Sequence, residues 1–501
     1  MWNDTMPRVR TVENMTCVVG IRLLKDARLT EETSDITAVE AEVEIHRPRM
    51  TLTGMTPGLH AILKQIQSEA VAQPELLAQA LRTDGLLGLG KLNKFLTKLE
   101  QFGYIQRQLV VNDIPAASIR PLSLLYRYED LKVEPGSRHV LSRFAYLRNE
   151  RDQIILECPL GHAEIACHSP AVMQVLFALA APKTVGEIAE AQTAFSEEAV
   201  TLFLNFLANA KALATVSGEL PELQNPEVHD AALAPWEFHD LLFHTRSRLG
   251  RHDRPYGGTY PFKDKLAPLP IVKKESSDQA IPLYRPDLER LKTQDVPFTE
   301  VLERRSSIRN HGDSPLTLEQ LGEFLYRSAR VKEVVEQGGV SFRPSPGGGA
   351  LHELEIYPLV ERCQGLDAGL YHYNPLRHEL YRVAERNSYV ELLIRMAAYT
   401  AKLESFPQVL LIISARFQRM QHKYQSMTYS VILKNVGALY QTMYLVGTAM
   451  GLATSALGGG HSDVFAQAAG LNYMEETSVG EFILGSIGTG PGIKSGQSIA
   501  Q

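Results

Sequence analysis

"RPSPGGGALHELEIYPLV", residues 343–360, places two prolines and three consecutive glycines directly ahead of an alternating apolar run. Glycine packs poorly and costs backbone entropy, so three in succession are unfavourable unless the chain must turn sharply or approach another group closely. The residues that follow alternate in the manner of a β-strand. The stretch therefore predicts a strand over 353–361, entered either through a tight turn or through backbone held against another group.

The residues around this strand predict the fold of the C-terminal part of the chain. Thr317, followed three residues later by Gln320, forms a capping box at the start of a helix over 317–331. A long apolar helix is predicted over residues 430–451. Because hairpins outnumber strand–helix–strand units, we expect an α+β fold with a mainly antiparallel sheet over residues 296–501. The further strands are predicted at 369–374, 379–384, 406–417 and 478–488.

Two similar segments precede this domain. Each begins a helix with a hydroxyl N-cap, Thr56 or Ser169, and a proline at the first helical position. Each then reads as strands, helix, helix and a short strand, which predicts two winged-helix-like domains at residues 1–130 and 131–222. Their second helices are poor in arginine, so we expect them to bind peptide rather than DNA, with pure scaffolding as the alternative.

The next segment, residues 223–295, is dense in proline, glycine and charge. It contains the helical pattern WEFHDLLFHTRSR at 236–248 and otherwise predicts a linker or an arm that wraps over a partner. The fourth region, residues 296–501, is the α+β domain.

The overall composition excludes several classes of protein. The chain has 501 residues, 44% of them apolar, and a net charge of −6, so no basic field indicates nucleic acid. No secretory signal and no membrane-spanning run is visible. The four cysteines lack metal-ligand spacing, which predicts reduced thiols of a cytoplasmic protein and no metal site.

Three features of the α+β domain carry possible chemistry. Arg305, Ser307 and Arg309 alternate, so in an extended chain two guanidinium groups flank a hydroxyl as in a phosphate clamp, although a solvated connector has the same pattern. Three glycine-bearing loops, at 347–349, 458–460 and 485–492, allow backbone amides to approach the polar edge of a flat ring. Between the strand at 406–417 and the long helix stand Lys423 and Tyr424, a pair whose basicity burial or neighbouring charge can adjust.

Together, the R-x-S-x-R motif, the P-S-x-G-G motif, the long apolar helix with its glycine-rich loop, and VGEFILGSIG resemble the FMN-dependent nitroreductase superfamily. More narrowly, WEFHDLLFHTRSR with RPSPGGGALHELEIY is similar to the SagB-type dehydrogenases, the azoline oxidases that form thiazoles and oxazoles in ribosomal peptides. The N-terminal duplication is similar to the peptide-binding domains of the cyanobactin azoline oxidases. The resemblance covers residues 235–490.

The resemblance implies that FMN lies at a homodimer interface, with the glycine loops near its ring and the arginines at its phosphate and ribityl chain. His311 departs from the pattern, because an aromatic residue often follows the R-x-S-x-R motif. The implied cofactor-binding residues are Arg305, Ser307, Arg309, Pro344, Ser345, Gly347, Gly348, Gly458, Gly459 and Lys494.

The resemblance also implies a reaction. One member of the pair Lys423 and Tyr424 removes the Cα proton of a thiazoline or oxazoline ring, hydride leaves the β-carbon for the flavin, and dioxygen accepts the electrons. The implied partner is an azoline-containing precursor peptide, without nucleic acid or membrane. Two alternatives stay open: a SagB-like or NAD(P)H-dependent flavin nitroreductase acting on a small molecule, and a non-enzymatic winged-helix binding protein.

Overall fold

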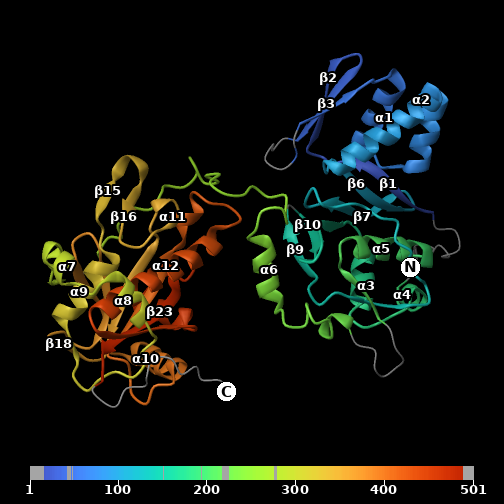
Figure 1. Ribbon diagram of the computed structural model, residues 1–501. Coiled ribbons are helices and arrows are strands. Elements are labelled where there is room, and N and C mark those ends of the chain that lie inside the picture. The colour runs from blue at the N-terminus through green and yellow to red at the C-terminus, as the bar shows by residue number, and fades with distance from the viewer. Residues whose placement is uncertain are drawn as a thin grey trace, which may run out of the picture. The chain divides into compact units, whose positions relative to one another are not determined.

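The computed structural model describes residues 16–41, 47, 49–150, 152–192, 194–216, 225–275 and 279–488. The chain divides into two units, Met1–Pro255 and Tyr256–Gln501, which follow one another along the colour bar (Figure 1). The segment 223–295 is divided between them: the helix predicted at 236–248 belongs to the first unit, and residues 256–275, called the arm below, belong to the second. The finer domain boundaries remain predictions.

In its described residues, the first unit contains three sheets and the helices that cover them. Its largest sheet has the strand order β5-β1-β6-β7-β11-β10-β9, and β2-β3-β4 and β12-β8 form the smaller ones. The helical segments are α1 (Pro57–Ser68), α2 (Gln73–Gln101), α3 (Pro170–Ala178), α4 (Val185–Glu190), α5 (Glu197–Asn209), η2 (Pro226–Val228) and α6 (Phe238–Arg246). The strands are β1 (Cys17–Leu23), β2 (Ala27–Thr33), β3 (Ile36–Ala41), β4 (Met50–Thr53), β5 (Val71–Ala72), β6 (Ile105–Val111), β7 (Ile114–Pro121), β8 (Arg138–Leu141), β9 (Tyr146–Glu150), β10 (Gln153–Glu157), β11 (Ala163–Cys167) and β12 (Leu213–Val216).

Both predicted helix starts are confirmed. The Leu59 N–H donates to the Thr56 hydroxyl at the start of α1, and the Ala171 N–H donates to the Ser169 hydroxyl at the start of α3. Each of the two predicted N-terminal domains contains one more helical segment than predicted. In the first, α2 is interrupted at Gly85, whose φ is 66°, and in the second, α4 precedes α5. The winged-helix assignment itself remains a prediction.

Helix α6, predicted from WEFHDLLFHTRSR, is confirmed, and an ion pair ties it to the large sheet. Arg246 donates from Nε and Nη2 to one oxygen of Glu157, at 3.0 and 2.8 Å. Burial raises the pKa of the Glu157 carboxyl, but Arg246, Tyr146 and Arg148 outweigh it and lower this pKa to about 2. The arginine of the motif therefore holds α6 against β10.

As far as the structure describes it, the second unit has one large sheet with helices around it and two short strand pairs. The helical segments are α7 (Leu288–Gln294), α8 (Phe298–Arg304), α9 (Leu318–Ala329), η3 (Glu336–Gly338), η4 (Gly348–Ala350), α10 (Ser388–Ala401), α11 (Phe417–Gln421), α12 (Thr428–Ala449) and α13 (Ser462–Ala469). The strands are β13 (Ala280–Pro282), β14 (Leu316–Thr317), β15 (Glu333–Val335), β16 (Val340–Phe342), β17 (Leu354–Val360), β18 (Cys363–Gln364), β19 (Gly369–Asn374), β20 (Glu379–Ala384), β21 (Val409–Arg416), β22 (Leu452–Leu457) and β23 (Glu476–Ser486).

The large sheet has the order β13-β20-β19-β17-β21-β23-β22, and all its neighbouring strands are antiparallel, which confirms the predicted α+β fold. Strand β17 pairs with β21 from Leu354↔Ala415 to Val360↔Val409. Alternate residues of β21 enter two different cores: Leu411 and Ile413 pack with residues of α9 and α12, whereas Leu410 and Ile412 pack with residues of α10 and α13. Burial on both faces explains why the strand is apolar without interruption.

The elements that matter for function lie along helix α12. Helix α12 contacts η4, α8 and β22. Strands β15 and β16 form a hairpin that projects at one end of the unit (Figure 1). The predicted capping box of α9 is confirmed, since Thr317 and Gln320 bond reciprocally.

Candidate active site

The glycine loop between β16 and β17 packs directly on α12. The Gly348 N–H donates to Asn435 Oδ1 at 3.0 Å, and Asn435 Nδ2 donates to Glu353 Oε1 at 2.8 Å. A Cβ on Gly348 would stand 2.5 Å from Val431 Cγ1, so only glycine permits this contact. The loop therefore brings backbone close to side chains of its own fold. The predicted cofactor residues that it carries are Pro344, Ser345, Gly347 and Gly348.

The predicted pair Lys423 and Tyr424 lies at this loop. A Cβ on Gly349, whose φ is +61°, would stand 2.6 Å from Tyr424 Oη and 2.8 Å from Lys423 Nζ. Lys423 Nζ also lies 5.4 Å from the centre of the Tyr424 ring. Both backbone N–H groups donate to the Met420 carbonyl, at 3.1 and 2.8 Å, because the pair follows the end of α11. Gly349 and Lys423, 74 positions apart in the sequence, thus meet in one place.

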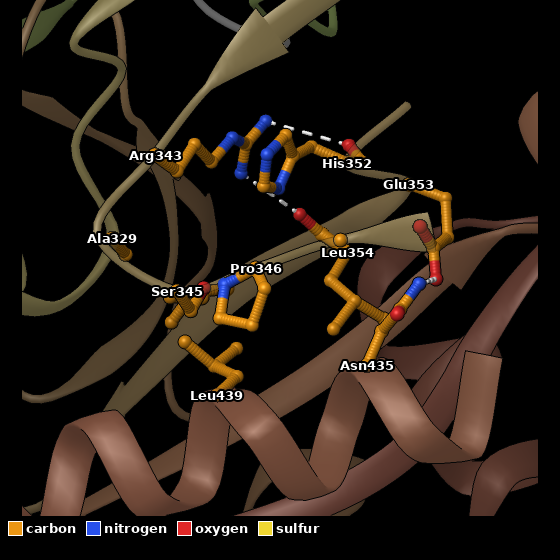
Figure 2. Close-up of a pocket in the computed structure, with 11 residues that line it drawn as sticks. Ala329, Arg343, Ser345, Pro346, His352, Glu353, Leu354, Asn435 and Leu439 are labelled. Atoms are coloured by element: carbon orange, nitrogen blue, oxygen red, sulfur yellow. Dashed lines mark hydrogen bonds between the residues drawn. The ribbon is translucent and has the colours of Figure 1, made fainter. Parts of the chain in front are cut away.

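Behind the loop lies a cavity of about 20 Å³, enough for one water molecule (Figure 2). Arg343 reaches into this region and donates to the carbonyls of Leu354 and His352, at 3.2 and 3.5 Å. Burial, with Arg343 and Arg419 nearby, lowers the pKa of His352 to about 3. Burial raises the pKa of Glu353, whose Oε2 has no hydrogen-bond partner in the described residues. The loop therefore rests on buried polar groups, and a flavin does not fit in this cavity.

The R-x-S-x-R motif lies further along α12, at Tyr444. The hydroxyls of Ser307 and Tyr444 are 2.9 Å apart, and the Arg305 guanidinium lies 5.3 Å from the centre of the Tyr444 ring. Within the described part of the chain, neither Arg305 nor Arg309 has a carboxylate partner. Two guanidinium groups without carboxylate partners, which flank a hydroxyl in the sequence, suit the phosphate of a mononucleotide.

The same tyrosine connects this motif to the second glycine loop. The Ala456 N–H donates to Tyr444 Oη at 2.7 Å, and Gly458 and Gly459 follow directly after β22. No atom lies within 4 Å of a Cβ built on either glycine, so their backbone is open. A Cβ on Gly460, in contrast, would collide with the buried Glu481 carboxyl. Burial raises the pKa of Glu481 to about 7, although the His461 backbone N–H acts in the opposite direction.

The predicted site residues thus form two groups. The glycine-loop group consists of residues 344–349 with Lys423 and Tyr424, and the arginine group consists of 305–309 with 458–459. They contact α12 at Asn435 and Tyr444, nine residues or about 14 Å of helix apart. Lys494 lies outside the described residues.

His311, the departure from the superfamily pattern, is accommodated as a packed neutral ring. Its Nδ1 accepts the Gln408 N–H at 3.1 Å, and its ring lies against Gly485, where a Cβ would collide with it. Burial and the nearby Arg362 lower the pKa of His311 to about 4. The imidazole therefore replaces an aromatic ring without carrying a charge at neutral pH.

Sequence reasoning missed a groove of about 860 Å³ beside Lys423. The groove is lined by residues 268–272 of the arm, by the turn at 336–339, by Leu376 and by Arg419. The one signal in the sequence was the apolar run at 268–272 within a polar segment.

Comparisons with known proteins give family matches for parts of both units. The nitroreductase family matches residues 302–488, and the cyanobactin oxidase ThcOx family matches residues 139–253. A protein of Methanocaldococcus jannaschii named "Putative nitroreductase" is 33% identical over 173 residues, which cover 34% of this chain and 81% of the relative. The microcin B17-processing protein McbC of Escherichia coli is 32% identical over 114 residues, which cover 22% of this chain and 42% of McbC.

A solved structure from Ralstonia eutropha, also described as a "putative nitroreductase", is 23% identical and has a TM-score of 0.34. It covers 47% of this chain and 100% of its own. Among the described residues, no helix combines the length and the apolar character needed to cross a membrane. From the match of residues 302–488 and from the relative that is one-third identical over most of its length, the chain belongs to the nitroreductase family.

Proposed function

We propose that this protein is an FMN-dependent oxidase that converts thiazoline or oxazoline rings in ribosomally made peptides to thiazoles or oxazoles, with dioxygen as the electron acceptor. The observation that carries the proposal is the position of Lys423, which lies against Gly349 on one side and lines a groove of about 860 Å³. A proton-accepting group between a predicted flavin loop and a substrate-sized groove is what this oxidation requires.

The substrate class is supported by the comparisons. Residues 139–253 match the cyanobactin oxidase family, and the microcin B17-processing protein McbC is similar over 114 residues. A reductase of small molecules does not need an additional unit as large as Met1–Pro255. We infer that its two winged-helix-like halves hold the leader or the core of the precursor peptide. The four free cysteines favour a cytoplasmic location.

The residues present fit FMN. Arg305 and Arg309 would hold the phosphate, Ser307 the ribityl chain, and the open backbone of Gly458 and Gly459 the ring edge. Bound FMN would supply the acceptor for the hydride lost from the β-carbon of the azoline. The chain itself supplies the group that takes the Cα proton: Lys423 Nζ and Tyr424 Oη both lie beside Gly349, and either can serve.

A homodimer completes the site in this proposal. The arginine group of one subunit would hold FMN against the glycine-loop group of the other, which accounts for their separation along α12. Apolar side chains around these groups are exposed, as expected for a surface that a second copy covers. They are Phe298 at 66%, Leu302 at 42%, Tyr429 at 46%, Leu433 at 38% and Ile487 at 47% exposed.

The first experiment is a visible spectrum of the purified protein, followed by mass spectrometry of a synthetic thiazoline peptide incubated with it in air. We expect a yellow protein that removes two hydrogens per ring, and a Lys423→Ala variant that keeps its flavin but loses turnover. A yellow protein that leaves the peptide unchanged yet reduces nitroaromatic compounds with NAD(P)H would favour the small-molecule reductase. A colourless protein that cannot take up FMN would contradict both.

Subunit complementation tests the shared site. An Arg305→Ala/Arg309→Ala chain and a Lys423→Ala chain, each inactive alone, are unfolded together and refolded as a mixture. If FMN bridges two subunits, half of the mixed dimer's sites are intact, and about a quarter of the activity returns. No recovery would mean that each subunit builds its own site.

A further inference from the structure

The groove beside Lys423 has walls from three separate parts of the second unit. Residues 268–272 form one wall, the turn at 336–339 another, and Leu376 closes the rim. The walls are largely apolar and open to solvent: Leu376 is 51% and Tyr260 47% exposed. An exposed apolar concavity of this size is typical of a ligand site rather than of a packing defect.

One buried arginine, Arg419, fixes two of these walls and joins them to the segment after the glycine loop. The Arg419 guanidinium donates to the carbonyl of Leu269 in the arm at 2.9 Å and to that of Gly339 in the turn at 2.9 Å. It also donates to the Leu351 carbonyl after the glycine loop, at 2.6 and 3.2 Å. Burial, with Arg416 and Arg343 nearby, lowers the pKa of Arg419 to about 10, so it stays charged at neutral pH. A buried charge is costly unless it is hydrogen-bonded, and the carbonyls that satisfy Arg419 belong to the walls of the groove. The groove is therefore a defined part of the fold rather than a chance gap.

The arm is also tied to the segment that carries Lys423. The Tyr260 N–H donates to the Lys423 carbonyl at 3.0 Å, and Gly257 and Gln425 exchange two backbone hydrogen bonds, at 3.2 and 3.0 Å. Arg416 donates to the carbonyls of Pro270 and Ile271, at 2.9 and 3.1 Å. The wall and the predicted catalytic lysine thus keep a fixed distance from each other.

The hairpin adds a feature that suits an extended chain. In the described residues, β15 pairs only with β16, so the opposite edge of β15 has no strand neighbour. Val334, in the middle of β15, lines the groove. A free strand edge beside an apolar groove is the geometry by which peptides bind through added main-chain hydrogen bonds.

We propose that this groove receives the azoline-bearing stretch of the peptide in extended form, with the ring at Lys423 and the flanking side chains against residues 268–272 and Leu376. The inference rests on the proposed function and deepens it, because it names a specificity determinant: apolar residues beside the ring bind better than acidic ones. Leu376 is the rim residue through which this preference acts.

The test compares two exposed leucines of the same unit in the FMN-loaded full-length protein. Leu376→Asp changes the groove, whereas Leu266→Asp, at a residue that is 44% exposed, changes the arm outside the groove. The substrate is a synthetic peptide with one thiazoline flanked by leucines. We expect Leu376→Asp to raise KM about tenfold with kcat and FMN content unchanged, and Leu266→Asp to leave all three unchanged.

Other results would overturn the inference. If Leu376→Asp still oxidises the peptide with an unchanged KM, the groove is not the peptide-binding site, whereas the proposed function still holds. If the unaltered protein binds FMN but oxidises no peptide, the proposed function is wrong. Fluorescence anisotropy of the fluorescein-labelled peptide then tests the groove separately, and equal peptide affinity of Leu376→Asp and Leu266→Asp would contradict the groove as the binding site. A dimer that becomes monomeric only in Leu376→Asp would mean that a second copy covers the groove.

Discussion

Gly349 and Lys423 lie so close together that a Cβ on the glycine would stand 2.8 Å from the lysine Nζ. The glycine also has φ +61°, where a side chain is strained. We therefore predict that Gly349→Ala displaces Lys423 and lowers kcat at least about tenfold, by analogy with other small misplacements of catalytic groups. Steady-state kinetics on the thiazoline peptide measure this effect.

Gly470→Ala is the matched control for that variant. Gly470 has φ +64° at the end of α13, and no atom lies within 4 Å of its Cβ position. Both alanine substitutions introduce the same kind of backbone strain, but only the alanine at 349 would collide with Lys423. Equal kcat losses in the two variants would show that strain, and not the contact with Lys423, is responsible.

Asn435 is predicted to hold the glycine loop. Replacement by leucine leaves the Gly348 N–H and Glu353 Oε1 without partners in a buried place. We expect Asn435→Leu to lower the free energy of unfolding by about 1–3 kcal/mol, measured by urea titration. In Glu353→Gln the acceptor oxygen remains, so this companion variant should lose much less. A larger loss in Glu353→Gln would contradict the role of the asparagine.

Glu481 makes the stability of the second unit depend on pH. The pKa of this carboxyl is raised to about 7 in the folded state, from its ordinary value of 4.5, so between these values the folded chain holds more protons than the unfolded one. Stability from this group therefore falls as pH rises from 4.5 to 7. Glu481→Gln removes the penalty and should gain on the order of 2 kcal/mol at pH 8 relative to pH 5.

Calorimetry at the two pH values measures this gain. The control is Glu404→Gln, at an exposed glutamate of the same unit, which should respond equally at both pH values. A Glu481→Gln variant with the same stability change at pH 5 and pH 8 would mean that the native carboxyl is ionised throughout.

Arg246 is predicted to secure α6. Without it, Glu157 remains buried, at 3% exposure, with less positive charge around it. We expect Arg246→Met to destabilise the first unit by about 3–5 kcal/mol, as measured by thermal unfolding. Arg248→Met alters an exposed arginine two residues away in the same motif and should change stability little. Similar losses in both would point to helix propensity rather than the ion pair.

The regular parts of the second unit were predictable because their signals are local. Alternation marked β17, an apolar run marked β21, and the Thr317–Gln320 box marked α9. The glycine at 451, with φ +67°, follows the end of α12. Helix α4 was missed although its own capping box, Thr184 with Glu187, stands in the sequence, because six residues are too few to show a helical period.

The groove could not be predicted, for a different reason. Residues 256–275 lack periodicity because side chains such as Arg416 and Arg419, more than 140 positions away, satisfy their carbonyls. Buried arginines are also indistinguishable in sequence from surface ones. The contact of Lys423 with the glycine loop was not predicted either, since nothing local connects the two segments, and the family resemblance only related each of them separately to the flavin reaction.

The way in which the arm is anchored has a consequence for how this protein diverges. Arg416 and Arg419 donate hydrogen bonds to backbone carbonyl oxygens, which every amino acid possesses. This anchoring therefore does not depend on which side chains residues 269–271 carry. Substitutions at residues 269–271 can alter the wall of the groove while the hydrogen bonds from Arg416 and Arg419 to the backbone remain. The side chains of the arm can therefore change independently of its anchoring, and in the proposed oxidase exchanging residues 269–271 is a direct way to change which peptides bind.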